Sequence, residues 1–191
     1  MDQAEQLRNI IKANQGPGRP LARVITVTSG KGGVGKSNTS INLALQFRKM
    51  GQRVIILDAD FGLANIEIMF GTVPKHNLCD LIYQGKNIKD IITWGAGDVG
   101  FISGGSGIVG MANLSRGYLT YIIQNLAQLD AIADVIIIDT GAGISDAVLD
   151  AILEKDPNHT ISLNVQEQVE RWMKYLQDNN VLSGHEYGEY I

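Results

Sequence analysis

Short runs of consecutive apolar residues alternate along the chain with stretches in which apolar residues recur every three or four positions. The runs are typical of buried strands in a parallel sheet, and the spaced stretches are typical of amphipathic helices. Apolar, largely β-branched runs occupy residues 24–28, 54–57, 99–102 and 135–138. Because strands and helices alternate, the pattern predicts β-α-β units. We therefore expect an α/β fold, a doubly wound and mostly parallel sheet with helices on both faces.

The helices are predicted from the spacing of their apolar residues and from residues that start and stop helices. The first is predicted from Ser37 to Lys49, with Gly51 as the residue that stops it. Two short helices follow, at residues 62–71 and after Asn77, which has a side chain suited to an N-cap. Further helices are expected over residues 115–129, after Ser145, and along the apolar stripe Val165, Val169, Trp172 and Leu176, with a strand at residues 160–165 before this last one.

Changes in composition divide the chain into four segments. Residues 1–12 are expected to form a short helix, because Ala4, Leu7, Ile10 and Ile11 lie on one apolar stripe. A helix of this length is marginal alone and would fold in a partner's groove, although a frayed or self-packed terminus has the same pattern. Residues 13–20 form a Gly/Pro hinge, residues 21–153 the main domain, and residues 154–191 a C-terminal strand, helix and tail.

Between the first predicted strand and the first predicted helix lies the sequence TSGKGGVGKSN, residues 28–38. It fits the phosphate-binding loop pattern G-x-x-x-x-G-K-[ST] in full. Glycines let successive amides turn towards a polyphosphate, and the helix N-terminus adds further N–H groups, although a flexible glycine turn matches such a pattern by chance. We expect ATP or ADP with Mg²⁺ here, with Lys36 on the β- and γ-phosphates and Ser37 on the metal. The predicted binding residues are Gly30, Lys31, Gly32, Gly33, Val34, Gly35, Lys36, Ser37 and Asn38.

Three aspartates follow the apolar strands, where the ligands of open α/β sheets bind. Asp58 and Asp60 end the second predicted strand, and Asp139 ends the most apolar one. Each alone would be an ordinary strand-end turn or helix cap, but together with a complete phosphate loop they indicate a metal site. We expect Ser37, Asp58 and Asp139 to hold Mg²⁺, and Asp60 to orient or deprotonate the attacking water.

Composition restricts the remaining choices of class and compartment. The 191 residues suit one domain, with 45% hydrophobic and 19% charged residues. A net charge of −4 argues against a general nucleic-acid binder, so we expect no sequence-specific nucleic-acid partner. Cys79 is the only cysteine, which excludes an internal disulfide and favours a reducing compartment. With no signal-peptide pattern at the N-terminus, a cytoplasmic location is expected.

Three segments resemble the MinD/ParA group of ATPases. KGGVGKS resembles the group's deviant Walker A motif, DADFGLANIEIMFG its first switch and IIIDTGAGIS its second. The resemblance implies a P-loop NTPase fold of the SIMIBI, MinD-like class and ATPase activity. It also implies an ATP-dependent homodimer in which Lys31 reaches the partner subunit's phosphates. Lys31 and Asp60 would then be the catalytic residues, and hydrolysis would depend on dimerisation.

The N-terminal sequence DQAEQLR and the internal sequence ISGGSGI resemble the FlhG family (also called YlxH or FleN) of MinD-like regulators of flagellar number and placement. This resemblance implies that the first helix activates an FlhF-type GTPase, a relative of the signal-recognition-particle GTPases. Flagellar basal-body proteins are further expected partners, and a peripheral position at the inner face of the cell membrane would follow. The residues implied in partner binding are Asp2, Gln3, Ala4, Leu7 and Arg8.

The resemblance covers Asp2 to about Leu153, and the family's C-terminal part is expected to be absent or divergent. The adenine-contacting residues and the membrane-targeting helix of the family are not recognisable here. Two alternatives therefore stay open beside the flagellar ATPase. One is a truncated or degenerate member that binds nucleotide or partners without ATP turnover. The other is a MinD/ParA-like ATPase of cell division or partition.

Overall fold

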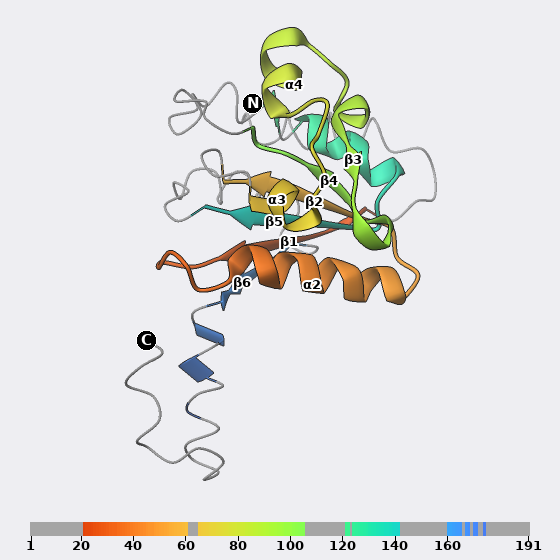
Figure 1. Ribbon diagram of the computed structural model, residues 1–191. Helices are drawn as coiled ribbons and strands as arrows, with labels where there is room; N and C mark the ends of the chain where they lie inside the picture. The colour runs from red at the N-terminus through yellow and green to blue at the C-terminus, as the bar shows by residue number, and fades with distance from the viewer. Residues whose placement is uncertain are drawn as a thin grey trace, which may run out of the picture.

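A computed structural model describes residues 21–60, 65–105, 121–122, 124–141, 160–165, 167–168, 170–171 and 174. Within these residues one six-stranded sheet has the order β3-β4-β2-β5-β1-β6 (Figure 1). Only the short edge strand β3 runs antiparallel to its neighbour. The strands are β1 (Arg23–Thr28), β2 (Val54–Ala59), β3 (Thr93–Trp94), β4 (Gly100–Ile102), β5 (Val135–Thr140) and β6 (Thr160–Asn164). The predicted mostly parallel α/β sheet is confirmed.

The helices that the structure describes are short, apart from the one after the glycine-rich loop. The α-helices described over their full length are α2 (Lys36–Lys49), α3 (Asn65–Phe70) and α4 (Leu78–Gln84), and the 3₁₀ helices are η1 (Ile88–Ile91), η2 (Ala96–Asp98) and η4 (Ala127–Ala131). Two further α-helices, within residues 121–126 and 165–174, are described only in part. Asn77 caps α4 as predicted, because its side chain accepts the N–H of Cys79 and Asp80 accepts the N–H of Asn77. In this part of the chain no helix is long and apolar enough to cross a membrane.

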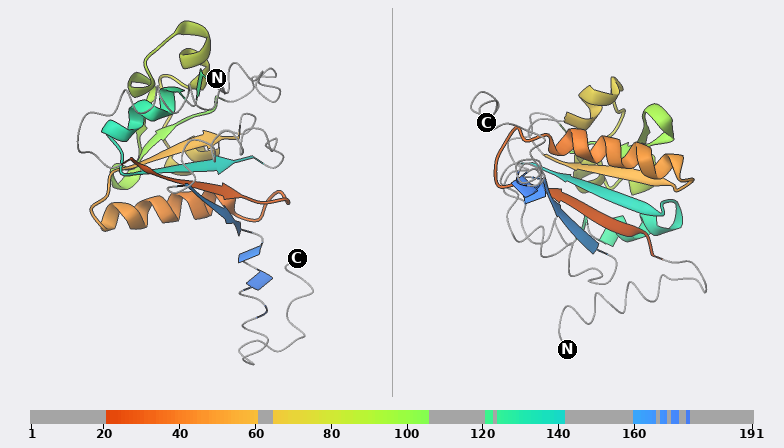
Figure 2. Two further views of the ribbon diagram at one scale, coloured as in Figure 1. Left: turned by 180° about the vertical axis from the view of Figure 1, so that it is seen from behind. Right: turned by 90° about the horizontal axis from the view of Figure 1, so that it is seen from below.

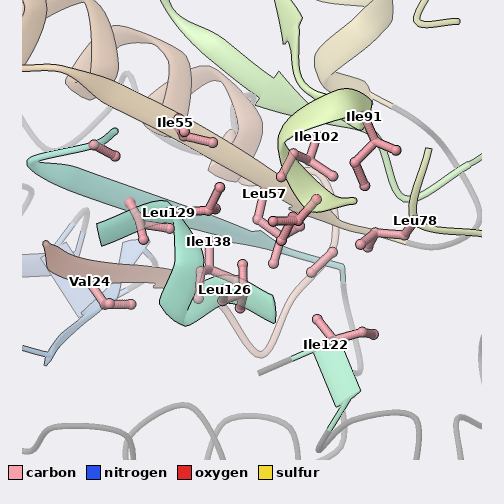
Figure 3. Packing of buried hydrophobic residues seen from close by; sticks show 14 of the residues in the cluster. Val24, Ile55, Leu57, Leu78, Ile91, Ile102, Ile122, Leu126, Leu129 and Ile138 are labelled. Atoms are coloured by element: carbon pink, nitrogen blue, oxygen red, sulfur yellow. The ribbon is translucent and has the colours of Figure 1, made fainter. Parts of the chain in front are cut away.

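Side chains of β1, β2 and β5 alternate between two hydrophobic cores, which explains why these strands are apolar at nearly every position. On one face, Val24, Leu57 and Ile138 pack against residues of α4, η1 and η4 (Figure 3). On the other face, the intervening residues pack against α2 and α3. Figure 2 shows α2 running along one side of the strands. Both faces of the sheet are therefore covered, as expected for a doubly wound fold.

The predicted strand at residues 160–165 is confirmed as β6, which pairs in parallel with β1 from Val24↔Thr160 to Thr28↔Asn164. The two-residue strand β3 was not expected, since Thr93–Trp94 has no apolar run. The predicted helix over residues 115–129 is described only in part, and it passes into η4 at Ala127. The expected N-terminal helix, the Gly/Pro hinge and the helix after Ser145 lie outside the described residues.

The strand order brings the three chemically important strand ends together. β5 lies between β1 and β2, with Val27 opposite Asp139 and Asp58 also opposite Asp139. The segments after these strands therefore leave the sheet at the same edge, the one formed by the carboxyl ends of the parallel strands. The glycine-rich loop, Asp60 and Gly141 all follow there, which makes this edge the candidate site.

Candidate nucleotide site

The loop between β1 and α2 adopts backbone conformations that favour glycine. Gly33 has a φ of 74°, and Gly35, the residue before α2, has a φ of 89°. A side chain at either position would strain the backbone. At Gly30, an added Cβ would meet no protein atom within 4 Å. Among the described residues, the space beside Gly30 is therefore open, which leaves room for a ligand close to the backbone.

The N-terminus of α2 keeps the properties of an anion site. No side chain caps it, and its first turn contains no acidic residue. The carbonyl of Gly35 accepts both the N–H (2.9 Å) and the hydroxyl (3.0 Å) of Thr39, which fixes the first turn. Unpaired N–H groups and the positive end of the helix dipole favour a negatively charged group here. These residues therefore fit a polyphosphate.

The two lysines of the loop occupy different environments. Lys36, the first residue of α2, is only 8% exposed, and its charge lies near enough to Asp139 to lower the pKa of that carboxyl. Lys31 is exposed on the outer part of the loop, where Ser29 accepts its backbone N–H (3.1 Å). Lys36 is thus buried at the start of α2 and Lys31 is exposed, while the separate roles of the two cations stay a prediction.

Asp139, at the end of β5, is the buried carboxylate that faces α2. It is 1% exposed, and its Oδ1 accepts the hydroxyl of Ser40 (3.0 Å). Burial raises the pKa of Asp139, while hydrogen bonds from Ser37 and Ser40 and the charge of Lys36 oppose that rise. Its Oδ2 is buried and has no hydrogen-bond partner among the described residues. A cation or its bound water would satisfy this oxygen, so Asp139 fits a Mg²⁺ ligand, and the role of Asp139 and Ser37 in holding the metal stays a prediction.

Asp58 is fully buried, and both of its carboxylate oxygens hold backbone groups. Oδ1 accepts the N–H of Asp60 (3.1 Å), and Oδ2 accepts the N–H of Ile66 (3.2 Å) at the start of α3. The pKa of Asp58 is raised to about 7, mainly by burial and further by the charges of Asp139 and Asp60, with the two N–H groups opposing the rise. Asp58 therefore fixes the backbone on both sides of residues 61–64. A direct bond from Asp58 to a metal stays a prediction.

Asp60 belongs to the segment that resembles the family's first switch, and its carboxyl lies close to Gly141 in the segment that resembles the second. Its Oδ2 accepts the side-chain N–H of Asn65 (3.3 Å). A Cβ added to Gly141 would lie 3.0 Å from the carboxyl carbon of Asp60, so this carboxylate lies against the segment that follows Asp139. A carboxylate in the first switch-like segment and against the second suits a group that orients water at a terminal phosphate, and that role also stays a prediction.

The ligand set at this edge suits magnesium better than a transition metal. The described residues contain no group of three His, Cys, Asp or Glu that could hold a metal ion. Ser37 and Asp139 offer hard oxygen ligands, and Mg²⁺ is usually bound by one or two such groups together with phosphates and water. The residues present thus fit a magnesium–nucleotide complex.

Sequence patterns alone missed one member of the site, and one group of predicted residues is not tested by the structure. Ser40 was not predicted, although a polar residue on the sheet-facing side of α2, beside Ile41 and Ala44, is a usable signal for a buried contact. The predicted partner-binding residues Asp2, Gln3, Ala4, Leu7 and Arg8 lie outside the described residues.

Comparison with known proteins gives a consistent family. Residues 21–169 match the family model ParA, described as NUBPL iron-transfer P-loop NTPase. The chain is 42% identical to the antiactivator FleN of Pseudomonas aeruginosa over 66% of this chain and 45% of that protein. It is 37% identical to the flagellum site-determining protein YlxH of Helicobacter pylori over 64% of this chain and 42% of that protein. The chain therefore spans less than half the length of these two relatives.

Solved structures agree with the fold. The cell division ATPase MinD of Pyrococcus furiosus superposes with a TM-score of 0.59 and 27% identity, over 70% of this chain and 56% of that one. The septum site-determining protein MinD of Pyrococcus horikoshii, solved in complex with Mg-ADP, superposes with a TM-score of 0.61 and 23% identity, over 81% of this chain and 66% of that one.

Proposed function

The chain belongs to the ParA family of P-loop NTPases, and on this basis we propose that it is an ATP-binding and ATP-hydrolysing switch that regulates flagellar number and placement. One observation carries the proposal for ATP. The open N-terminus of α2, the buried Lys36 and the unpaired Oδ2 of Asp139 meet at one edge of the sheet. They supply the anion site, the cation and the metal ligand that a magnesium–nucleotide complex needs.

The residues divide the work of hydrolysis between binding and turnover. Lys36 and the first N–H groups of α2 would hold the β- and γ-phosphates, and Ser37 and Asp139 would hold Mg²⁺, which neutralises phosphate charge. Asp58 would keep α3 and Asp60 in place through its two backbone hydrogen bonds. Asp60 would orient the attacking water and accept its proton.

The proposed dimer gives Lys31 its role. Its exposure outside the core of the site supports a contact with the phosphates of a second copy rather than with its own. A cation supplied there would stabilise charge that develops in the transition state, so ATP turnover would require two subunits. The nucleotide state would then control the assembly state, and the assembly state would control which partners bind.

Support for a flagellar role comes from the relatives and from the N-terminal sequence. YlxH is named a flagellum site-determining protein, and FleN, at 42% identity, is an antiactivator. DQAEQLR, residues 2–8, resembles the segment that activates an FlhF-type GTPase, so we assign this partner to residues 2–11. A second candidate is a family member that binds nucleotide and partners without ATP turnover.

Turnover measured against protein concentration tests the switch. If two subunits are needed, ATP hydrolysed per protein molecule rises with concentration in the parent. Lys31→Ala should remove this rise while ATP affinity stays within about threefold, because the residue serves the neighbouring site. Lys49→Ala, an exposed lysine at the far end of α2, is the matched control. Equal, concentration-independent turnover in parent and Lys31→Ala would refute the dimer. Absence of turnover in the parent, with ATP still bound, would favour the second candidate.

A further inference from the structure

The first residues of α3 make consecutive contacts with the candidate site and with a neighbouring strand end. The side chain of Asn65 donates to Asp60 (3.3 Å), and the N–H of Ile66 donates to Asp58 (3.2 Å). The next residue, Glu67, accepts the hydroxyl of Ser103 at its Oε2 (2.9 Å). Contacts to the two aspartates and to Ser103 therefore come from three adjacent residues, and a movement of one would displace the others.

Ser103 lies directly after β4, at the level of the nucleotide site. Leu57 pairs with Ile102, so the following residues, Asp58 and Ser103, occupy the next position in the same register. Ser103 is 1% exposed, and its oxygens are engaged on two further sides. Its hydroxyl accepts the N–H of Gly105 (3.1 Å), and its carbonyl accepts the N–H of Leu78 (2.9 Å), the first residue of α4.

The hydrogen bonds of the Ser103 hydroxyl have a defined direction. Because this hydroxyl accepts from Gly105, its own hydrogen is left for Glu67. A hydroxyl that donates to a carboxylate forms a charge-assisted bond, and a chain of such bonds is stronger than its separate members. Removal of the hydroxyl would leave two polar groups without this partner, one of them on α3.

We propose that Glu67 and Ser103 form a positioning pair for ATP hydrolysis, a role that rests on the proposed function of the site. The pair holds the start of α3 where Asn65 and Ile66 meet Asp60 and Asp58. Neither Glu67 nor Ser103 belongs to the phosphate loop, which lies between β1 and α2. Loss of the pair therefore changes the orientation of the water-orienting carboxylate, and it leaves the groups that hold the phosphates in place.

Variants of Glu67 separate this role from simple packing. Glu67→Met keeps the length of the side chain but removes the acceptor, whereas Glu67→Gln keeps an oxygen acceptor. Glu67→Met and Ser103→Ala should lower kcat for ATP by about tenfold and leave KM within about twofold, with Glu67→Gln close to the parent. Asp90→Asn, the same acid-to-amide change at an exposed position, is the control.

Hydrogen exchange without nucleotide gives a second readout that does not require ATP turnover. Amides of residues 65–70 should exchange faster in Glu67→Met and Ser103→Ala than in the parent, with Glu67→Gln near the parent and residues 36–49 unchanged in all. Two results would overturn the positioning role. One is a change of both kcat and KM that accompanies a loss of global stability. The other is an unchanged kcat in every variant. If the parent hydrolyses no ATP, the proposed function fails, and unchanged exchange in residues 65–70 would separately overturn the pair.

Discussion

Ionisation of the buried Asp58 should make the nucleotide-free protein less stable as pH rises through neutrality. Burial raises the pKa of Asp58 from 3.8 to about 7. Between these values the folded state keeps a proton that the unfolded state has released. The folded state then binds more protons, so the free energy of unfolding falls as pH increases. This is the reverse of the usual behaviour of a salt-bridged aspartate.

The size of the effect follows from the same shift. Each pH unit between the two pKa values changes stability by about 1.4 kcal/mol. From pH 5 to the folded-state pKa of about 7, the contribution of Asp58 is therefore a loss of about 3 kcal/mol. Above that pKa the loss is complete, and below 3.8 it is absent. Part of the lost stability would be recovered when a cation binds beside Asp139, because the charged form of Asp58 would then be favoured.

Urea unfolding at pH 5 and pH 8 measures this contribution when the parent is compared with Asp58→Asn. The amide cannot ionise and retains one oxygen acceptor, so the variant is expected to lack the loss of about 3 kcal/mol that the parent shows. Asp90→Asn, at an exposed position, should behave as the parent does. An equal change of stability with pH in the parent and in Asp58→Asn would refute the assignment of this buried charge.

Two further predictions concern turnover and partner binding. Asp60→Ala should bind ATP with an affinity within about threefold of the parent but accumulate as the ATP-bound dimer, because the attacking water is no longer oriented. Light scattering with ATP and with ADP measures the dimer fraction, and equal fractions in parent and variant would contradict this role. A peptide of residues 2–11 should bind an FlhF-type GTPase and raise its GTP turnover. Burial of Leu7 alone would contribute about 1.5–3 kcal/mol to the binding. The matched peptide Leu7→Ser should bind more weakly, and equal GTP turnover with and without the parent peptide at saturation would remove this partner.

Most of the sheet could be predicted from the sequence because its central strands are buried on both faces. Consecutive apolar residues in β1, β2 and β5 have no other stable environment. The aspartates near the ends of β2 and β5, Asp58 and Asp139, indicate the edge that binds ligands. The edge strand β3 could not be predicted in this way. It has two residues and no apolar pattern, and it exists because Thr93 and Trp94 pair with Phe101 and Gly100 of β4.

The polar contacts of the site were predicted less completely than the loop itself. The glycine pattern is local in sequence, so Gly30–Ser37 could be identified directly. The hydrogen bond of Ser40 to Asp139 joins residues 99 positions apart, and the contact of Ser103 with Glu67 joins residues 36 apart. Such pairs depend on strand order and register, which composition and periodicity do not specify.

Titration of the protein with Mg²⁺-ATP by calorimetry, with and without Lys36, tests the central claim most directly. Lys36 is buried beside Asp139 at the start of α2 and would be the main cationic partner of the phosphates. Lys36→Ala should weaken binding at least about a hundredfold, or about 3 kcal/mol, while Lys49→Ala on the same helix should match the parent. Affinity for Mg²⁺-ATP that is the same in Lys36→Ala and in the parent would contradict a nucleotide site at this edge of the sheet.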